Sequence, residues 1–253
     1  MDMPANLDAL MNPAAEVRQV DAIPAIRDAA IRDAALAAGA RVCLVIRSKE
    51  IVADTERNAT SLDKTFNFGY LVEGNVLPPV VSEERERVVS GGGKVLRTAD
   101  KVYRIERDAQ LVTVIPTWRN YLYVGLSSAP AVTAPPAALI PKNDAERAVW
   151  RQSADIGCKA GREQADTAYQ ANIAKLTFEY EGMLRFKTMI SRNMAVAPVV
   201  AKSGVAVSGN GREMALNDET TRIMDDGALQ PGADWTSGGK QGVFTSYKQR
   251  VAR

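Results

Sequence analysis

Apolar residues in the first third of the chain recur every three or four positions, beginning at Val17. This is the period of an amphipathic helix, so helices are expected over residues 17–74. Pro24 should bend the first helix or mark its boundary. Gly39 is placed to end it, because glycine tolerates the left-handed conformation that often follows a helix. A second helix is then expected over residues 41–57.

Beyond this point the pattern passes from helix to strand. A third helix is expected to start near Thr60, because Thr60 and Asp63 stand three residues apart like a capping pair. The hydrophobic period then changes to two, which is the period of strands. Gly91–Gly93 predicts a hairpin turn, and a second pair of strands is expected around Asp108–Ala109. Together these strands predict a small antiparallel β-meander over residues 86–115.

One long helix is expected over residues 143–193. Asn143 is a candidate N-cap, with Glu146 three residues further on. About 50 helical residues extend ~75 Å, more than the ~45 Å diameter of a compact chain of this length. The helix should therefore kink at Gly157 or Gly161, or project and meet a partner. The four-residue spacing of these two glycines also allows close helix packing.

Short strands are expected again over residues 199–224. Asn210–Gly211 is a strong signal for a hairpin turn, and Asn217–Asp218 is a second turn candidate. The fold class is therefore α+β, with N-terminal helices, a small antiparallel meander, a long helix and a C-terminal β-hairpin region. The expected organisation is a flexible arm over 1–15, a single module over 16–224 that includes a Pro/Ala/Ser-rich linker over 127–141, and a flexible tail over 225–253.

Composition narrows the chemistry of the chain. Its 253 residues include 32 Lys+Arg, 30 Asp+Glu and no His. Without histidine there can be no Ser-His-Asp triad, Cys-His dyad or imidazole-ligated zinc site. Acid–base chemistry would have to rest on Asp, Glu, Lys, Tyr or Cys, and no such constellation stands out. The nearly balanced charge provides no field that recruits nucleic acid. No catalytic residue, cofactor or metal site is predicted.

Two cysteines and one uncharged stretch of sequence indicate in which cellular compartment the protein could fold. Cys43 lies in an apolar run, so a buried free thiol is expected. A Cys43–Cys158 bridge is the alternative in an oxidising compartment. The first residues lack the basic region and apolar core of a signal peptide. The longest uncharged run, residues 120–140, is interrupted by prolines, which favours a loop over a membrane span.

The most informative aromatic cluster is Trp118, Arg119 and Tyr121, followed by Tyr123. Trp, Tyr and Arg are the residue types that most often anchor protein interfaces. The cluster therefore predicts either core anchors, where the meander packs against the helices, or anchors of an interface. A base-stacking platform for nucleic acid is disfavoured, because no basic groove surrounds the cluster.

Several motifs occur in a fixed order between about residue 25 and residue 224. They include the stretches 75–80, 99–105, 116–122, 139–143 and 197–202. In this order they resemble the DotC family of type IVB secretion systems, whose counterpart in conjugation is the TraI protein of IncI-type plasmids.

The resemblance implies a structural lipoprotein at the periplasmic face of the bacterial outer membrane. It implies partners, namely further copies of the chain, a DotD-like lipoprotein and a DotH-like outer-membrane protein. These form a ring for export of effector proteins or conjugated DNA. Family precursors carry a leader ending in a lipidated cysteine, which is not recognisable here, so the implied anchor is placed on no residue. The alternative function is a periplasmic enzyme that acts on cell-wall material through Asp or Glu.

Overall fold

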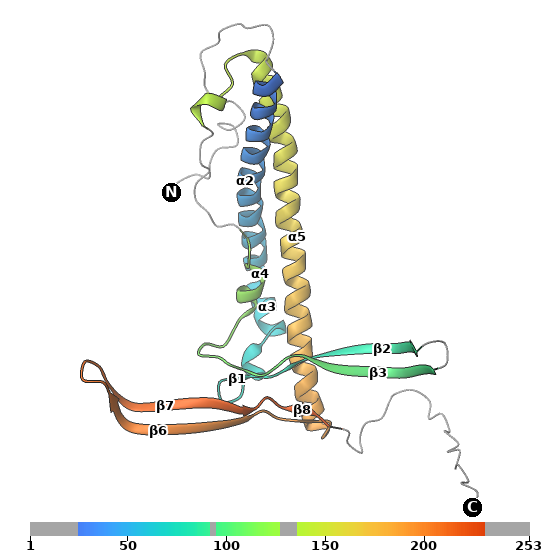
Figure 1. Cartoon of the computed structure of the whole chain (residues 1–253), viewed down its shortest axis with the longest axis vertical. Helices are drawn as coiled ribbons and strands as arrows, with labels where there is room; N and C mark the ends of the chain where they lie inside the picture. Colours follow the sequence, from blue (N-terminus) through green and yellow to red (C-terminus); the bar gives the residue numbers. More distant parts are fainter. Residues whose placement is uncertain (1–24, 92–94, 127–135, 231–253) are drawn as a thin grey trace, which may run out of the picture. The chain divides into compact units, whose positions relative to one another are not determined.

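The computed structural model describes residues 25–91, 95–126 and 136–230 (Figure 1). Internal contacts divide the chain into two compact units. Unit 1 comprises Met1–Asn67 and Pro116–Thr177, and unit 2 comprises Phe68–Ile115 and Phe178–Arg253. Helices and antiparallel strand pairs are both present, which confirms the α+β class. Within the described ranges, no helix has both the length and the hydropathy that a membrane crossing requires.

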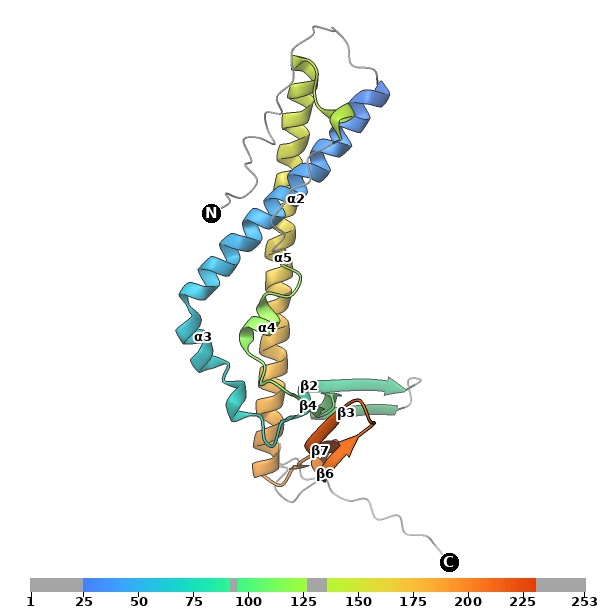
Figure 2. The same cartoon turned by 90° about the vertical axis from the view of Figure 1, so that its left-hand side faces the viewer.

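Two long helices form the body of unit 1. Helix α2 spans Ala25–Arg57, and α5 spans Asp144–Ser191 and continues into unit 2. The part of α5 in unit 1 lies beside α2 (Figures 1 and 2). Because the apolar residues of α2 recur every three or four positions, they form one stripe that packs on α5. The buried cluster between the helices consists of Ile31, Ala35, Ala38, Val42, Trp150 and Ala154.

Glycines let the two helices approach until their backbones touch. A Cβ atom added at Gly157 would lie 2.1 Å from the Leu36 carbonyl oxygen, and one at Gly161 would lie 2.1 Å from that of Ala40. At Gly39 the corresponding distance, to the Ala154 carbonyl oxygen, is 2.2 Å. The prediction that a helix ends at Gly39 is therefore wrong, since α2 runs through it. The long helix is also unbroken at Gly157 and Gly161, so close packing applies and the kink does not.

The start of α5 follows the prediction. The Asn143 side-chain oxygen accepts a hydrogen bond from the Glu146 backbone N–H at 2.8 Å, as an N-cap does. The Glu146 carboxylate in turn accepts hydrogen bonds from Arg27 Nε at 2.5 Å and Nη2 at 2.9 Å. Just before this start, η2 (Ala137–Leu139) forms one 3₁₀ turn. It lies at the end of the predicted linker, of which residues 127–135 lie outside the described ranges.

The third predicted helix is shorter than expected. Helix α3 covers Ala59–Thr65 and is preceded by Asn58, so Thr60 and Asp63 do not form its cap. A 3₁₀ turn, η1 (Phe68–Tyr70), follows in place of further α-helix. Asp63 has another role, because its carboxylate accepts a hydrogen bond from the indole N–H of Trp118, 55 residues further along the chain.

Unit 2 is built from two-stranded antiparallel sheets rather than a meander. Strands β2 (Val80–Gly91) and β3 (Val95–Arg107) form one long hairpin. Gly91 pairs with Val95, so the turn falls at the predicted glycines, although residues 92–94 lie outside the described ranges. The second pair of strands is not a continuation of it. Instead β4 (Gln110–Leu111) pairs with β1 (Val76–Leu77), so the predicted meander over 86–115 is wrong.

The C-terminal strands form a second long hairpin. Strand β6 covers Val199–Gly209 and β7 covers Met214–Asp225. The turn at Asn210–Gly211 is confirmed. The Asn210 side-chain oxygen accepts hydrogen bonds from the backbone N–H groups of Arg212 and Glu213, at 3.1 Å each. The turn predicted at Asn217–Asp218 is wrong. Asn217 has a positive φ of 54° but lies within β7, where asparagine tolerates the left-handed region better than most residues.

The C-terminal part of α5 anchors these sheets. The buried cluster of unit 2 consists of Val81, Phe186, Met189, Met194 and Ala195. Strand β5 (Ala195–Val196) pairs with β8 (Ala228–Leu229), and the Gln230 N–H donates to the Met194 carbonyl at 2.9 Å. The prediction that the tail is flexible from residue 225 is therefore wrong as far as Gln230. The rest of the tail and the predicted arm over 1–15 lie outside the described ranges.

Candidate interaction site

A short helix places the three sequence-predicted anchors in unit 1. Helix α4 covers Trp118–Leu122. Its first turn is fixed by the Asn120 side-chain oxygen, which accepts hydrogen bonds from the Thr117 backbone N–H at 2.8 Å and hydroxyl at 3.0 Å. This local arrangement turns Trp118 inward and leaves Arg119 and Tyr121 partly exposed.

Trp118 is packed inside unit 1. Its side chain is 1% exposed. The indole Nε1–H donates a 2.7 Å hydrogen bond to the Asp63 carboxylate, which satisfies the one polar group that a buried tryptophan has. Its ring meets Tyr123 edge to face at a centroid distance of 5.8 Å. The residue therefore ties α4 to α3.

Arg119 contacts both Glu56 and the ring of Trp118. Its guanidinium binds the Glu56 carboxylate with both oxygens engaged, at 2.8 Å from Nε and 2.7 Å from Nη2. It also lies 4.1 Å from the centre of the Trp118 ring, a favourable cation–π position. Such a fork-like pair fixes geometry more firmly than a single ion contact.

The electrostatics of the cluster hold its groups in fixed protonation states. Hydrogen bonds from Arg119 and from the Tyr123 hydroxyl, the latter at 2.8 Å, keep the pKa of Glu56 below its ordinary value. Burial, together with the hydrogen bond to Glu56, raises the pKa of Tyr123. The carboxylate stays ionised and the phenol stays protonated at neutral pH. The Glu56 carboxylate therefore accepts hydrogen bonds from both side chains at neutral pH.

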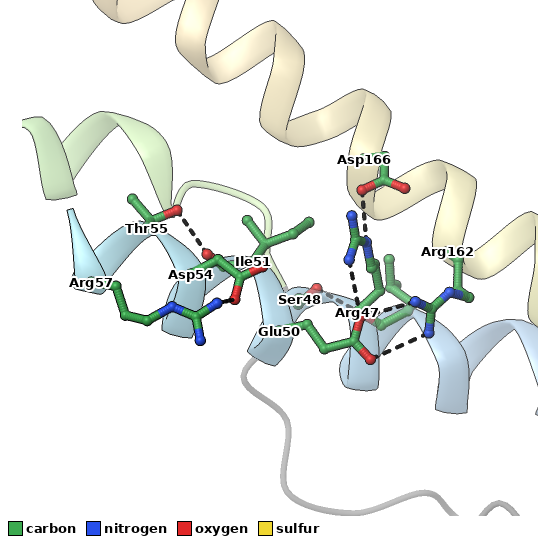
Figure 3. Close-up of polar contacts among 10 residues, drawn as sticks. Arg47, Ser48, Glu50, Ile51, Asp54, Thr55, Arg57, Arg162 and Asp166 are labelled. Atoms are coloured by element: carbon green, nitrogen blue, oxygen red, sulfur yellow. Dashed lines mark hydrogen bonds and ion pairs between the residues drawn. The ribbon is translucent and has the colours of Figure 1, made fainter.

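A second polar network joins α2 to α5 in unit 1 (Figure 3). Arg47 donates to Asp166 at 2.8 Å and to Glu50 at 3.0 Å, and Arg162 donates to Glu50 at 2.9 Å. The two arginines, Arg47 first, hold the pKa of Glu50 below its ordinary value. The four charges alternate in sign, with Arg47 and Glu50 on α2 and Arg162 and Asp166 on α5, so they fix the register of one helix against the other.

A disulfide joins the same two helices. Cys43 and Cys158 are bonded, with their Cα atoms 4.9 Å apart. The prediction of a free buried thiol at Cys43 is therefore wrong, and the alternative bridge is correct. The cysteines lie close to Gly39, Gly157 and Gly161, where the backbones touch. We refer to this disulfide, these glycines and the ion network as the α2–α5 seam.

Sequence reasoning missed most of this seam because its partners are far apart in the chain. The bonded cysteines are 115 residues apart, and the signal that could have revealed them is the pairing of α2 with α5. The described residues contain no group of three or more His, Cys, Asp or Glu side chains able to hold a metal ion.

Comparison with known families identifies the chain. Residues 25–237 match the TraI family model, described as type IV secretory system, conjugal DNA–protein transfer. The chain belongs to this family. The match covers both units of this TraI-family protein and includes Trp118, Arg119 and Tyr121. None of the curated proteins compared with the chain matches it. The TraI-family protein is thus a component of a type IV secretion apparatus, and the part of its three anchor residues in an interface remains a prediction.

Proposed function

We propose that this TraI-family protein is a structural subunit of the outer-membrane core complex of a type IVB secretion or conjugation system. In this role it assembles with further copies of itself, a DotD-like lipoprotein and a DotH-like outer-membrane protein. The resulting ring exports effector proteins or conjugated DNA. The family match over residues 25–237 is the observation that carries the proposal.

The construction of unit 1 supports a mechanical role. A subunit that works by shape must present its surfaces in a fixed geometry. The α2–α5 seam supplies this rigidity through a disulfide, backbone contacts at three glycines and alternating charges. The polar groups of the Trp118 cluster are likewise engaged with one another, which favours a positioned surface over a reactive one.

The disulfide also supports the proposed location. Disulfides form and persist in oxidising compartments such as the bacterial periplasm and are rare in the cytosol. A bridge between α2 and α5, the two longest helices of the described residues, is therefore expected of a protein that folds outside the cytoplasm. Both cysteines of the sequence are used in it, so neither is assigned as the lipid attachment site that the family resemblance implies.

The test is to follow the full chain, expressed with the other genes of its secretion system, through membrane fractionation. We expect it in the outer-membrane fraction, and we expect DotD-like and DotH-like proteins to co-purify in constant ratio. Deleting its gene should abolish transfer, and restoring it should recover transfer. Recovery of the chain alone from the cytosol would contradict the proposal. So would cleavage of purified peptidoglycan that a single Asp or Glu substitution abolishes.

A further inference from the structure

In the described part of unit 2, one β-motif occurs twice. The β1–β4 motif and the β5–β8 motif each combine a pair of short strands with one long hairpin. In the short strands of the first, Val76 pairs with Leu111. In those of the second, Ala195 pairs with Leu229. The hairpins then agree in register pair by pair, except near the middle, where each lacks one pair. Each also has a register shift directly after its first residue.

Sequence and backbone details support the correspondence. Pro-Val-Val leads into both long hairpins, at residues 79–81 and 198–200. Arg-Ile stands at equivalent places in the returning strands, at residues 104–105 and 222–223. Equivalent backbone N–H groups also close both motifs, namely that of Val112, which donates to the Asn75 carbonyl at 2.8 Å, and that of Gln230, which donates to the Met194 carbonyl at 2.9 Å. What covers one motif therefore indicates what the other can accept.

Helix α5 covers one face of the β1–β4 motif. It crosses β2 at Gly182, where an added Cβ atom would lie 2.5 Å from Val80 Cγ1 and 3.1 Å from the Val81 backbone nitrogen. Phe186, one turn further along α5, belongs to the same buried cluster as Val81. Val80 and Val81 are 1% and 0% exposed. This face therefore accepts a helix that carries a small residue at the crossing and a large apolar residue four positions later.

Two charges of α5 match charges on the β1–β4 motif. The Arg107 guanidinium donates a hydrogen bond at 2.5 Å to the carboxylate of Glu179, three residues before Gly182. Arg185, three residues after Gly182, lies 3.8 Å from the Glu83 carboxylate. The helix therefore presents an acidic residue on one side of the crossing and a basic residue on the other.

Among the described residues, the same face of the β5–β8 motif is only partly covered. Val199, the equivalent of Val80, is 52% exposed. Val200, the equivalent of Val81, is half-buried and lines a mainly apolar cavity of about 90 Å³. A two-stranded sheet is marginally stable in water unless one face is packed. This face therefore has both the apolar residues and the space for a further element.

The charges on this face are exchanged relative to the β1–β4 motif. Lys202 occupies the position of Glu83. Asp225 occupies the position of Arg107. Both are exposed, and the ion pair of Lys202 with Glu219 is an exposed one, which is weak. A helix with the charges of α5, including α5 of a second copy, would meet like charges here. The face therefore selects a helix with the opposite arrangement.

We propose that this face of the β5–β8 motif binds a helix of another subunit of the secretion apparatus. The helix carries Gly or Ala where it crosses Val199. Three positions before this small residue stands Lys or Arg, which faces Asp225. Three positions after it stands Asp or Glu, which faces Lys202, and a large apolar residue follows directly and enters the cavity beside Val200. The proposal rests on the proposed function and adds the chemistry of a partner helix.

Two synthetic peptides test the chemistry of this face. Both carry residues 178–191 of α5 and are held helical by a side-chain bridge between the exposed positions 184 and 188. One of them also carries E179K and R185E. Fluorescence anisotropy measures their binding to the purified full chain. The charge-exchanged peptide should bind at least ten-fold more tightly than the unchanged peptide. Equal affinities, or no binding of either peptide, would overturn the proposal.

The preference should reverse when the β5–β8 motif receives the charges of the β1–β4 motif. The chain with K202E and D225K should bind the unchanged peptide at least ten-fold more tightly than the charge-exchanged one. The matched control is R222E, because Arg222 is exposed and pairs with Ala201 on the opposite face. It should leave both affinities within three-fold of wild type. An unreversed preference in a variant whose thermal midpoint is unchanged would overturn the proposal.

Photo-cross-linking tests the contact in the native particle. p-Benzoylphenylalanine replaces Val199 in the full chain, expressed with its secretion system, and replaces Ala201 in the control. Cross-linking from position 199 should be at least five-fold stronger, and the linked segment should show the stated order of basic, small, acidic and apolar residues.

A linked segment without this order, or a cross-link to lipid or to α5 of a second copy, would overturn the proposal. A recovered particle without any cross-link would overturn it while leaving the proposed function standing. Absence of a particle for the wild-type chain would overturn the proposed function, and with it the assignment of the helix to a subunit of the apparatus.

Discussion

Removing the disulfide should destabilise unit 1 by several kcal/mol. The change is the double substitution C43A and C158A. Cys43 is 1% exposed, and both residues lie among the small side chains of the α2–α5 seam, so alanine fits at both positions. The main loss is then the restraint that the bridge imposes on the unfolded chain.

The magnitude follows from the length of chain that the bridge closes. The cysteines are 115 residues apart. In the chain-entropy model a loop of this length loses about 16 cal/mol/K on closure, which is ~4.8 kcal/mol at 25 °C. Loss of bridges in natural proteins typically costs about 2–5 kcal/mol. We therefore expect the free energy of unfolding to fall by about 3–5 kcal/mol.

Tryptophan fluorescence can follow this unit during urea unfolding. Trp118 and Trp150 are 1% and 0% exposed and both belong to unit 1. Replacing the third tryptophan, as W235F, leaves only these two reporters. Reductant should shift the unfolding curve of the bridged chain to that of the double-alanine variant and should not move the variant itself. A loss below about 1 kcal/mol, or a reductant effect on the variant, would refute the reasoning.

Three further changes test the packing and the charges of unit 1. G157A places a Cβ atom 2.1 Å from a backbone oxygen, so urea unfolding should show a free energy of unfolding lower by about 1–3 kcal/mol or more. The control, A160G on the exposed side of the same helix, should lower it by only about 1 kcal/mol. W118A should cost about 3–5 kcal/mol in the same assay, and a loss under about 1 kcal/mol would show that Trp118 is not a packing residue. The hydrogen bond from Arg27 lowers the pKa of Glu146, so its stabilising effect is present above the ordinary glutamate pKa of about 4.3 and is lost as pH falls through the lowered value. E146Q should therefore lower the melting temperature at pH 7, and the difference from wild type should shrink between pH 4 and pH 2; a constant difference would contradict this assignment.

Local signals in the sequence predicted the features that depend on neighbouring residues. The Asn143 cap, the long helix after it and the Asn210–Gly211 turn are each specified by a few adjacent side chains. The α+β class followed from the change of hydrophobic period, which also depends only on short windows of sequence. These features could be predicted because their energetics are local.

The features that failed depend on partners distant in sequence. Gly39 looks like a helix terminator until α5 lies against it. Leu111 has the alternation of a meander strand, but its partner is Val76 rather than β3. Cys43 looks like a core thiol until the helix pair brings Cys158 to it.

In the candidate site, too, the sequence predicted the residues but not their distant partners. Trp118, Arg119 and Tyr121 could be selected from residue type alone. The hydrogen bonds from Trp118 to Asp63 on α3 and from Arg119 to Glu56 on α2 could not be predicted in this way. The charge network of the seam also joins residues more than a hundred positions apart, because Arg47 bonds to Asp166 and Arg162 bonds to Glu50.

The molar mass of the native particle that contains this chain tests the central proposal most directly. The particle would be extracted from outer membranes with mild detergent, purified through a tag on the full chain, and measured by native mass spectrometry with quantification of each subunit. We predict a particle with many copies of the chain in fixed proportion to its DotD-like and DotH-like partners. A single copy of the chain without partners, in cells that still transfer DNA or effector proteins at the normal rate, would contradict it.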